Sequence, residues 1–178
     1  RMTAVDVLVV GAGPAGCAAA IRAAAGGLSV ALLHRPRPRR SWAGESLPPG
    51  MARPIRAVFG RGILSEGRHR PAMGTRSVWG SDALVETDFL RNPLGEGWLL
   101  DRAGFDADAR AAASAAGVRI VAWQRGARVE RSAAGWRAGD GIVARFAIDA
   151  TGRPASLLRA IGIHRAAADR QIALVATF

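Results

Sequence analysis

The sequence has no lysine, no tyrosine, one cysteine and only three histidines. A single cysteine cannot form an internal disulfide, and with so few histidines it cannot complete the ligand set of a zinc site. We therefore expect neither a disulfide framework nor a metal site. Cys17 lies among small residues in a helical pattern, which indicates packing more than chemistry.

The sequence also has no long apolar run that could cross a membrane. The uncharged stretch Val7–Ile21 is shorter than a bilayer-spanning helix and is interrupted by glycines. A secretory signal is another explanation of this stretch, but a strand, a glycine turn and a helix explain its residues better. We therefore expect a cytoplasmic globular protein with no membrane partner.

Charge of one sign predominates. All 25 basic residues are arginines, and with 14 acidic residues they give a formal net charge of +11. Such a charge attracts anionic cofactors, substrates or polypeptides, and nucleic acid has to be considered. The arginines are scattered, however, and no nucleic-acid-binding motif occurs, so we expect no nucleic-acid partner and attribute the charge to a preference for arginine.

The pattern of apolar residues predicts an α/β fold with a parallel sheet. A buried strand at Val5–Val10, a helix at Pro14–Ala25 and a second buried strand at Leu28–Leu33 form one βαβ unit. Residues 34–54 are rich in arginine and proline, which predicts an irregular surface loop.

Later segments extend this fold. Helical spacing over Asp101–Ala116 predicts a helix with Asp101 as its N-cap. A third parallel strand and a β-meander that returns to the sheet are expected from four segments: Val118–Trp123, Ala127–Arg131, Gly135–Arg137 and Ile142–Ala150. Together these elements predict a three-layer, Rossmann-like α/β domain.

A glycine-rich fingerprint follows the first strand and opens the helix. Gly11, Gly13 and Gly16 form G-x-G-x-x-G, with Ala12, Pro14 and Ala15 between them. The first glycine permits a tight turn, the second lets the backbone approach a pyrophosphate, and the third lets helix and strand pack closely. Another interpretation is a turn that merely joins strand to helix. The surrounding βαβ pattern favours dinucleotide binding.

The fingerprint lacks its usual acidic partner. A carboxylate about 20 residues further on ordinarily binds a ribose hydroxyl. Here the second strand ends in His34 and Arg35. Arg35 could meet the phosphate of NADP, lie near the adenosine half of FAD, or be a solvated loop residue. The residues alone leave these three roles open.

Four segments, in this order, resemble one family. They are Gly11–Gly16 (G-A-G-P-A-G), Gly44–Pro49 (G-E-S-L-P-P), Trp98–Asp106 (W-L-L-D-R-A-G-F-D) and Asp149–Arg153 (D-A-T-G-R). The chain resembles the flavoprotein monooxygenase superfamily that includes para-hydroxybenzoate hydroxylase, flavin-dependent tryptophan halogenases and geranylgeranyl reductases. Within it, the second and third segments are most similar to enzymes that oxidise a tryptophan in a polypeptide during quinone-cofactor maturation.

The resemblance implies FAD as cofactor and adds residues to the candidate site. In that superfamily the arginine matching Arg102 contacts FAD, the loop matching Gly44, Glu45 and Ser46 lies near the flavin, and the segment holding Asp149 and Gly152 lies beside the cofactor. The fingerprint residues with His34 and Arg35 complete the predicted cofactor site. Catalytic residues on the substrate side remain unassigned.

The resemblance also implies a division into two domains. Residues 1–75 and 93–171 are expected to form the FAD-binding domain. Residues 76–92, with Trp79, and residues 172–178 are expected to begin a substrate-binding sheet. The apolar run Ile172–Phe178 has nothing after it to cover it, so we expect a truncated chain.

The activity that the resemblance implies is monooxygenation of an electron-rich aromatic substrate, either a small molecule or a tryptophan in a polypeptide. The reductant would be NAD(P)H or a separate flavin reductase. The alternatives are a reductase or dehydrogenase of the geranylgeranyl reductase type, a halogenase, and a non-enzymatic NADP-binding module. Halogenases of this scaffold use a lysine beside the flavin path, and this chain has no lysine.

Overall fold

The structure of the 178-residue chain is a computed structural model that describes residues 2–36, 45–123, 128–133, 135–139, 141–164 and 166. Its described residues form two compact units. The large unit comprises residues 2–36 and those from 106 onward, and the small unit comprises residues 45–105. The boundary lies inside helix α3 (Arg102–Ala115). The predicted division between a cofactor domain and a substrate domain stays a prediction.

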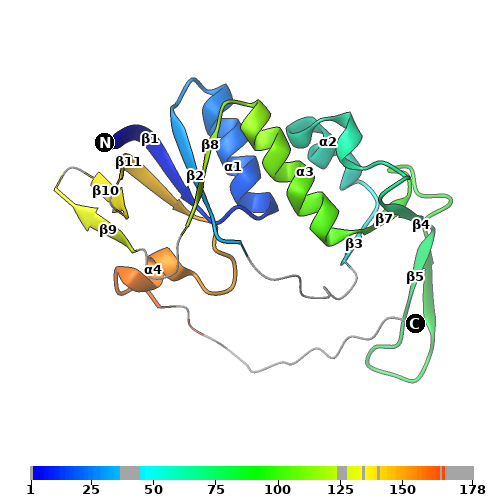
Figure 1. Cartoon of the computed structure of the whole chain (residues 1–178). Coiled ribbons are helices and arrows are strands. Elements are labelled where there is room, and N and C mark those ends of the chain that lie inside the picture. The colour runs from blue at the N-terminus through cyan, green and yellow to red at the C-terminus, as the bar shows by residue number, and fades with distance from the viewer. Residues whose placement is uncertain are drawn as a thin grey trace. The chain divides into compact units, whose positions relative to one another are not determined.

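The large unit is built on one six-stranded sheet (Figure 1). The strand order is β8-β2-β1-β11-β10-β9, in which the first four strands are parallel and β10 is antiparallel to both of its neighbours, β11 and β9. The strands are β1 (Thr3–Val10), β2 (Val30–His34), β8 (Arg119–Ala122), β9 (Val129–Ser132), β10 (Gly135–Ala138) and β11 (Ile142–Asp149). The predicted third parallel strand and the returning meander are confirmed.

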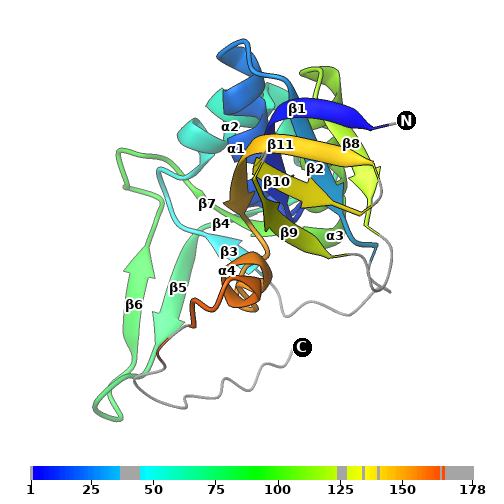
Figure 2. The same cartoon turned by 90° about the vertical axis from the view of Figure 1, so that its left-hand side faces the viewer.

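Both faces of the sheet are covered at its centre. The last four residues of β1 are all buried, as a strand covered on both faces requires. Leu8 and Val10 share a core cluster with Leu157 of α4 (Ser156–Ala160). Helix α1 (Pro14–Ala25) contributes Cys17 and other fully buried small residues, and Figure 2 shows β1 and β11 side by side at the centre of the sheet. The three-layer α/β fold is therefore confirmed.

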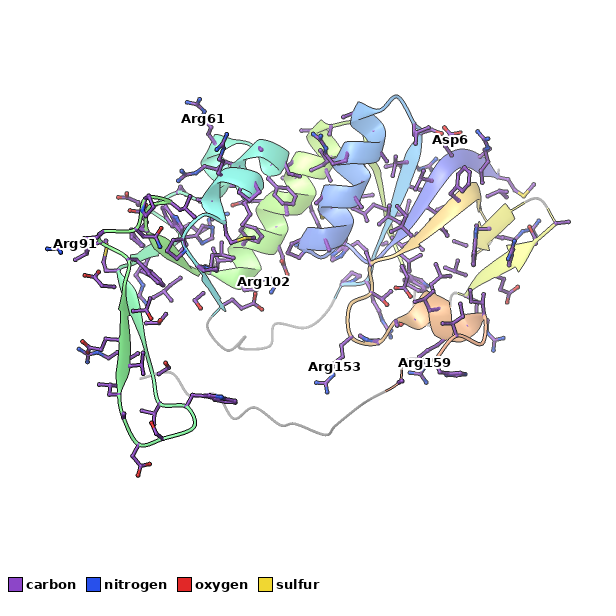
Figure 3. The ribbon with its side chains drawn as sticks, turned by 180° about the vertical axis from the view of Figure 1, so that it is seen from behind. Asp6, Arg61, Arg91, Arg102, Arg153 and Arg159 are labelled. Carbon is purple, nitrogen blue, oxygen red and sulfur yellow. The ribbon has the colours of Figure 1, made fainter. Side chains whose placement is uncertain are left out.

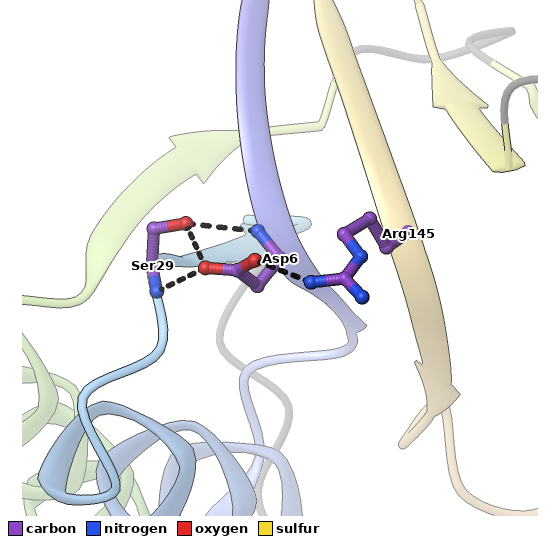
Figure 4. Close-up of polar contacts among 3 residues, drawn as sticks. All are labelled: Asp6, Ser29 and Arg145. Atoms are coloured by element: carbon purple, nitrogen blue, oxygen red, sulfur yellow. Dashed lines mark hydrogen bonds and ion pairs between the residues drawn. The ribbon is translucent and has the colours of Figure 1, made fainter.

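A polar contact joins β1 to the turn that precedes β2 (Figure 4). The Asp6 carboxylate accepts hydrogen bonds from the Ser29 hydroxyl at 2.6 Å and the Ser29 N–H at 2.9 Å, and Arg145 lies 3.4 Å away. These Ser29 bonds lower the pKa of Asp6, with Arg145 adding to the effect and burial opposing it. The contact fixes the return of the chain from α1 into the sheet.

The small unit contains a three-stranded antiparallel sheet in the order β3-β7-β4. Its elements are β3 (Glu45–Leu47), α2 (Ala52–Phe59), the 3-10 helix η1 (Arg61–Ile63), β4 (Arg70–Ala72) and β7 (Gly97–Leu100). The prediction that residues 34–54 form an irregular loop is therefore wrong where β3 and α2 occur. Strand β3 pairs with β7, some 50 residues later, and composition does not reveal such a pairing.

The small unit also carries a two-stranded hairpin of β5 (Gly74–Ser77) and β6 (Val85–Asp88), which overlaps residues 76–92. Trp79, in the connection between them, is 91% exposed. The predicted strand at Ile172–Phe178 lies outside the described residues. None of the described helices is long and apolar enough to cross a lipid bilayer.

Candidate cofactor-binding site

The glycine turn between β1 and α1 packs directly against the end of β11. Gly11 has a φ of +110°, and a Cβ there would lie 2.4 Å from the carbonyl oxygen of Ala150. A Cβ on Gly16 would lie 1.8 Å from the carbonyl oxygen of Gly11 and 3.1 Å from the Ala150 Cβ. All three distances are shorter than ordinary van der Waals contact. The fold itself therefore requires glycine at these two positions.

Gly13 differs from the other two glycines of the fingerprint. Its φ of −79° and ψ of 179° are open to any residue, and a Cβ there would meet nothing within 4 Å among the residues that the structure describes. Neither backbone conformation nor packing explains a glycine at this position. Open space beside a bare backbone at the start of a helix is what an approaching phosphate needs.

The start of α1 is electrostatically suited to an anion. Gly13 occupies the N-cap position without a side chain that could cap the helix, and the first turn holds no acidic residue. Pro14 is the first helical residue, where its missing N–H costs nothing. Neither the N-cap residue nor the first turn of α1 thus supplies a side chain that compensates the positive end of the helix dipole.

Beneath the turn, Ala12 and Cys17 are buried. The Cys17 thiol lies 3.6 Å from the carbonyl oxygen of Ala12, to which it donates. Burial raises the pKa of Cys17 to about 11, with Asp106 adding to the rise and Arg110 opposing it. Cys17 is therefore a packing residue, as its sequence context indicated. Ala15, in the first turn of α1, is exposed.

Asp149 organises the loop after β11. One carboxylate oxygen accepts from the Thr151 hydroxyl at 2.7 Å and from the Thr151 N–H at 2.9 Å. The other accepts from the N–H groups of Leu157 at 2.9 Å and Leu158 at 3.0 Å. Burial raises the pKa of Asp149, but these hydrogen bonds outweigh it and the net pKa is lowered. Asp149 thus holds the segment whose Ala150 carbonyl meets the glycine turn.

The same loop needs a glycine of its own. Gly152 has a φ of +75°, a conformation that other residues rarely adopt. It is exposed, and Arg153 projects from the chain immediately after it (Figure 3). The structure therefore brings the D-A-T-G segment beside the glycine fingerprint, at the carboxyl ends of β1 and β11. In open parallel sheets, ligands bind where the strand order reverses, as it does between these two strands.

At the end of β2, His34 is partly buried and Arg35 is exposed. Burial lowers the pKa of His34, and the positive charge of Arg110 lowers it further, while Asp106 opposes both. The carboxylate that acts on the end of β2 is therefore Asp106 of α3, which sequence reasoning did not connect with His34. Its position 72 residues away in the chain gave no signal.

In the small unit, Arg102 forms an ion pair with Glu45. Arg102 begins α3, where its positive charge opposes the helix dipole, and the Glu45 carboxylate compensates it. Asp101 is the N-cap, as predicted, because its Oδ1 accepts from the N–H groups of Ala103 at 3.1 Å and Gly104 at 3.2 Å. Figure 3 shows Arg102 at the start of this helix.

Two further predicted site residues of this unit are Gly44 and Ser46, and the structure describes only the second. Ser46 is exposed and lies opposite Leu99 in the β3–β7 ladder. Gly44 lies outside the described residues.

His69, which sequence reasoning missed, is the only fully buried polar or charged residue among those the structure describes. A lone histidine between two arginines carries no sequence signal of that burial.

Comparisons with known proteins agree with this geometry. Residues 6–45 match the family described as FAD binding domain, a range that includes the second part of β1, the fingerprint, α1 and β2. No curated protein is significantly similar in sequence to this chain. Many solved structures are similar.

Three of these structures carry most information. A flavoprotein/dehydrogenase from Cytophaga hutchinsonii is 26% identical, with a TM-score of 0.70 over 94% of this chain and 44% of that one. The peptidyl tryptophan dihydroxylase QhpG is 29% identical, with a TM-score of 0.65 over 95% and 35% of the two chains. A geranylgeranyl bacteriochlorophyll reductase-like protein from Thermoplasma acidophilum is 25% identical, with a TM-score of 0.74 over 91% and 43%. The chain spans less than half of the length of each. It therefore has the Rossmann-like FAD-binding fold of flavoprotein oxidoreductases.

Proposed function

We propose that the chain binds FAD and forms the cofactor-binding part of a flavin-dependent monooxygenase. The proposal that the chain binds FAD rests on Gly13. It is the one fingerprint glycine that neither its φ nor its packing explains. A phosphate beside it accounts for the missing side chain, for the uncapped start of α1 and for the match of residues 6–45 to FAD-binding domains.

Residues of the large unit suit the pyrophosphate and the adenosine half of the dinucleotide. The backbone N–H groups of Gly13, Ala15 and Gly16 can donate to the pyrophosphate. His34 and Arg35, at the end of β2, are assigned to the adenosine half. Asp149 and Gly152 shape the loop beside the turn. When bound, FAD supplies the redox chemistry.

We extend the cofactor site to Arg102, Glu45, Gly44 and Ser46. The resemblance of their two segments to flavoprotein monooxygenases supports this assignment. The Arg102–Glu45 ion pair adds support, because it links the two segments and holds the guanidinium in one place. Arg102 would then supply a fixed positive charge to an anionic cofactor.

The reaction we propose is hydroxylation of an electron-rich aromatic ring, with a tryptophan in a polypeptide as the first substrate to test. The similarity, at 29% identity, to the peptidyl tryptophan dihydroxylase QhpG supports it. The net charge of +11 favours an acidic polypeptide. NAD(P)H or a separate flavin reductase would supply electrons.

A reductase is the second candidate, because a geranylgeranyl bacteriochlorophyll reductase-like protein is 25% identical over 91% of this chain. Oxygen consumption separates the two reactions. A monooxygenase consumes oxygen and forms a hydroxylated ring, whereas a reductase saturates its substrate under anaerobic conditions. Similarity to halogenases, at 24% identity or less, concerns the fold alone.

The exposed hairpin is proposed to begin the substrate-binding side. Its apolar side chains Val78, Leu84 and Val85 are more than half exposed, and Trp79 almost fully so. A two-stranded hairpin is marginally stable alone, so further strands or a bound partner would stabilise it. A Trp79→Ser variant should keep FAD binding and lose substrate turnover. Loss of FAD binding would argue against this assignment.

The first experiment is a visible absorption spectrum of the purified protein, with the released cofactor identified by chromatography. Oxidised flavin bands and released FAD would support the cofactor proposal. A colourless protein that binds NADP but not added FAD would overturn it in favour of an NADP-binding module. Oxygen uptake with a tryptophan-containing acidic peptide, compared with a free small aromatic compound, then tests the substrate.

A further inference from the structure

We propose that His69 is a positioning residue that fixes the backbone of Asp101 and, through it, the Arg102 guanidinium. The inference rests on the proposed function of Arg102 toward FAD. It concerns a residue that lies outside all four segments of the family resemblance. All the contacts that carry it lie within the small unit.

The His69 ring is buried and held by two hydrogen bonds. Its side chain belongs to a residue that is 1% exposed. Nδ1 accepts from the Asp101 N–H at 3.1 Å, and Nε2 lies 3.1 Å from the carbonyl oxygen of Ile63. A backbone N–H can only donate and a carbonyl can only accept, so the ring is neutral with its proton on Nε2. Each ring nitrogen thus has one defined task.

Apolar contacts fix the ring between these two bonds. Phe105 meets His69 edge to face, with ring centroids 6.0 Å apart, and meets Phe59 in the same manner at 6.1 Å. Ile63 and Phe105 belong to one buried cluster with Leu64 and Trp98. The imidazole therefore presents Nδ1 to Asp101 from a rigid support.

Asp101 transmits this constraint to Arg102. Its N–H is held by His69, while its carboxylate accepts from the N–H groups of Ala103 and Gly104 in the first turn of α3. Asp101, the residue before Arg102, is thus held both by His69 and by the first turn of α3. Glu45, whose register partner in β3–β7 is Leu100, then meets the Arg102 guanidinium. Without the His69 bond, the start of α3 would keep its cap but lose the anchor that sets its position.

Two substitutions separate the tasks of the two ring nitrogens. In His69→Asn, the amide oxygen can replace Nδ1 as acceptor for Asp101. In His69→Gln, the amide NH₂ can replace Nε2 as donor to Ile63, but Asp101 loses its acceptor. Both variants lose the aromatic ring. Phe59→Leu serves as a control, because it loosens the same cluster without touching either bond.

The measurements are amide exchange of Asp101, ¹⁵N relaxation of the Arg102 Nε–H group, and the Kd for FAD, each with the full chain. We expect His69→Gln to raise exchange at Asp101, to loosen Arg102 and to weaken FAD binding by about tenfold, as for one lost hydrogen bond. The Kd of His69→Asn for FAD should stay within about threefold of the wild-type value. The melting temperatures of the two variants should fall by similar amounts. Phe59→Leu removes neither bond and should change Asp101 exchange, Arg102 relaxation and the Kd much less than His69→Gln does.

Equal effects of His69→Asn and His69→Gln on Arg102 would overturn the inference, because a purely structural histidine would not distinguish them. Unchanged Arg102 relaxation in His69→Gln would overturn it as well. If the wild type does not bind FAD, the proposed function fails, while Asp101 exchange and Arg102 relaxation still decide whether His69 positions the arginine.

Discussion

Gly11 and Ala150 approach so closely that a Cβ on Gly11 would lie 2.4 Å from the Ala150 carbonyl oxygen. This contact joins the turn after β1 to the loop after β11, two segments almost 140 residues apart. The three glycines of the fingerprint therefore have different physical roles. Gly11 and Gly16 serve the packing of the fold, and Gly13 leaves space for a ligand.

Substitution of a packing glycine should destabilise the protein. In Gly16→Ala the new methyl group would lie 1.8 Å from the Gly11 carbonyl oxygen, so the backbone of the turn must move. We expect a loss of about 3 kcal/mol in the free energy of unfolding, comparable to severe overpacking. Urea denaturation followed by circular dichroism measures this. A loss below about 0.5 kcal/mol would show that the turn can relax.

Substitution of Gly13 should separate binding from stability. Serine is a favoured N-cap, so Gly13→Ser should leave the free energy of unfolding unchanged or raise it by a few tenths of a kcal/mol. Its side chain would fill the space beside the helix start, and we expect FAD binding to weaken at least about tenfold. Gly62, whose Cβ would also meet nothing, provides the matched control Gly62→Ser. Equal FAD affinity in both variants would contradict the phosphate site.

Asp149 should contribute stability that disappears in acid. Its folded-state pKa lies below the ordinary value of 3.8, so the stabilisation is present above pH 3.8 and is lost as the pH falls through the folded-state pKa. Asp149→Asn should cost about 1 kcal/mol at neutral pH. Thermal unfolding between pH 3 and 7 tests this, and the difference from the wild type should shrink toward pH 3. A constant difference would mean that the carboxylate charge is not involved.

Arg102 should matter for cofactor affinity more than for folding. Arg102→Lys keeps the positive charge but loses the planar, multidentate guanidinium, so we expect FAD binding to weaken by roughly tenfold. Titration of the variant by flavin fluorescence measures this. Arg91→Lys changes an exposed arginine in the turn after β6 and serves as the control. If both variants bind FAD equally, Arg102 has no cofactor role.

The Cys17 thiol should be unreactive in the folded protein. It is 0% exposed, and burial raises its pKa to about 11, so very little thiolate forms near neutral pH. A thiol-specific reagent at pH 8 should label the native protein at least about a hundredfold more slowly than the urea-unfolded chain. Rapid labelling of the native state would show that the turn above Cys17 opens readily.

The sequence by itself determined the βαβ unit, the position of α3 with its Asp101 cap, and the meander. These features follow from local signals: apolar runs of strand length, helical spacing, and glycines at turns. The fingerprint likewise identified Gly11–Gly16, because its spacing reflects the local geometry of one strand, one turn and one helix. Predicted elements agree with the structure wherever the conformation of a segment depends on residues close to it in the sequence.

Only the tertiary structure decided which distant groups meet. The pairing of β3 with β7, which corrected the predicted loop, depends on backbone hydrogen bonds that leave no mark on composition. The contact of Gly11 with Ala150, the Glu45–Arg102 pair and the anchoring of Asp101 by His69 also join residues far apart in the chain. A sequence pattern reports the conformation of a segment, whereas a hydrogen bond between segments depends on where the whole chain places them.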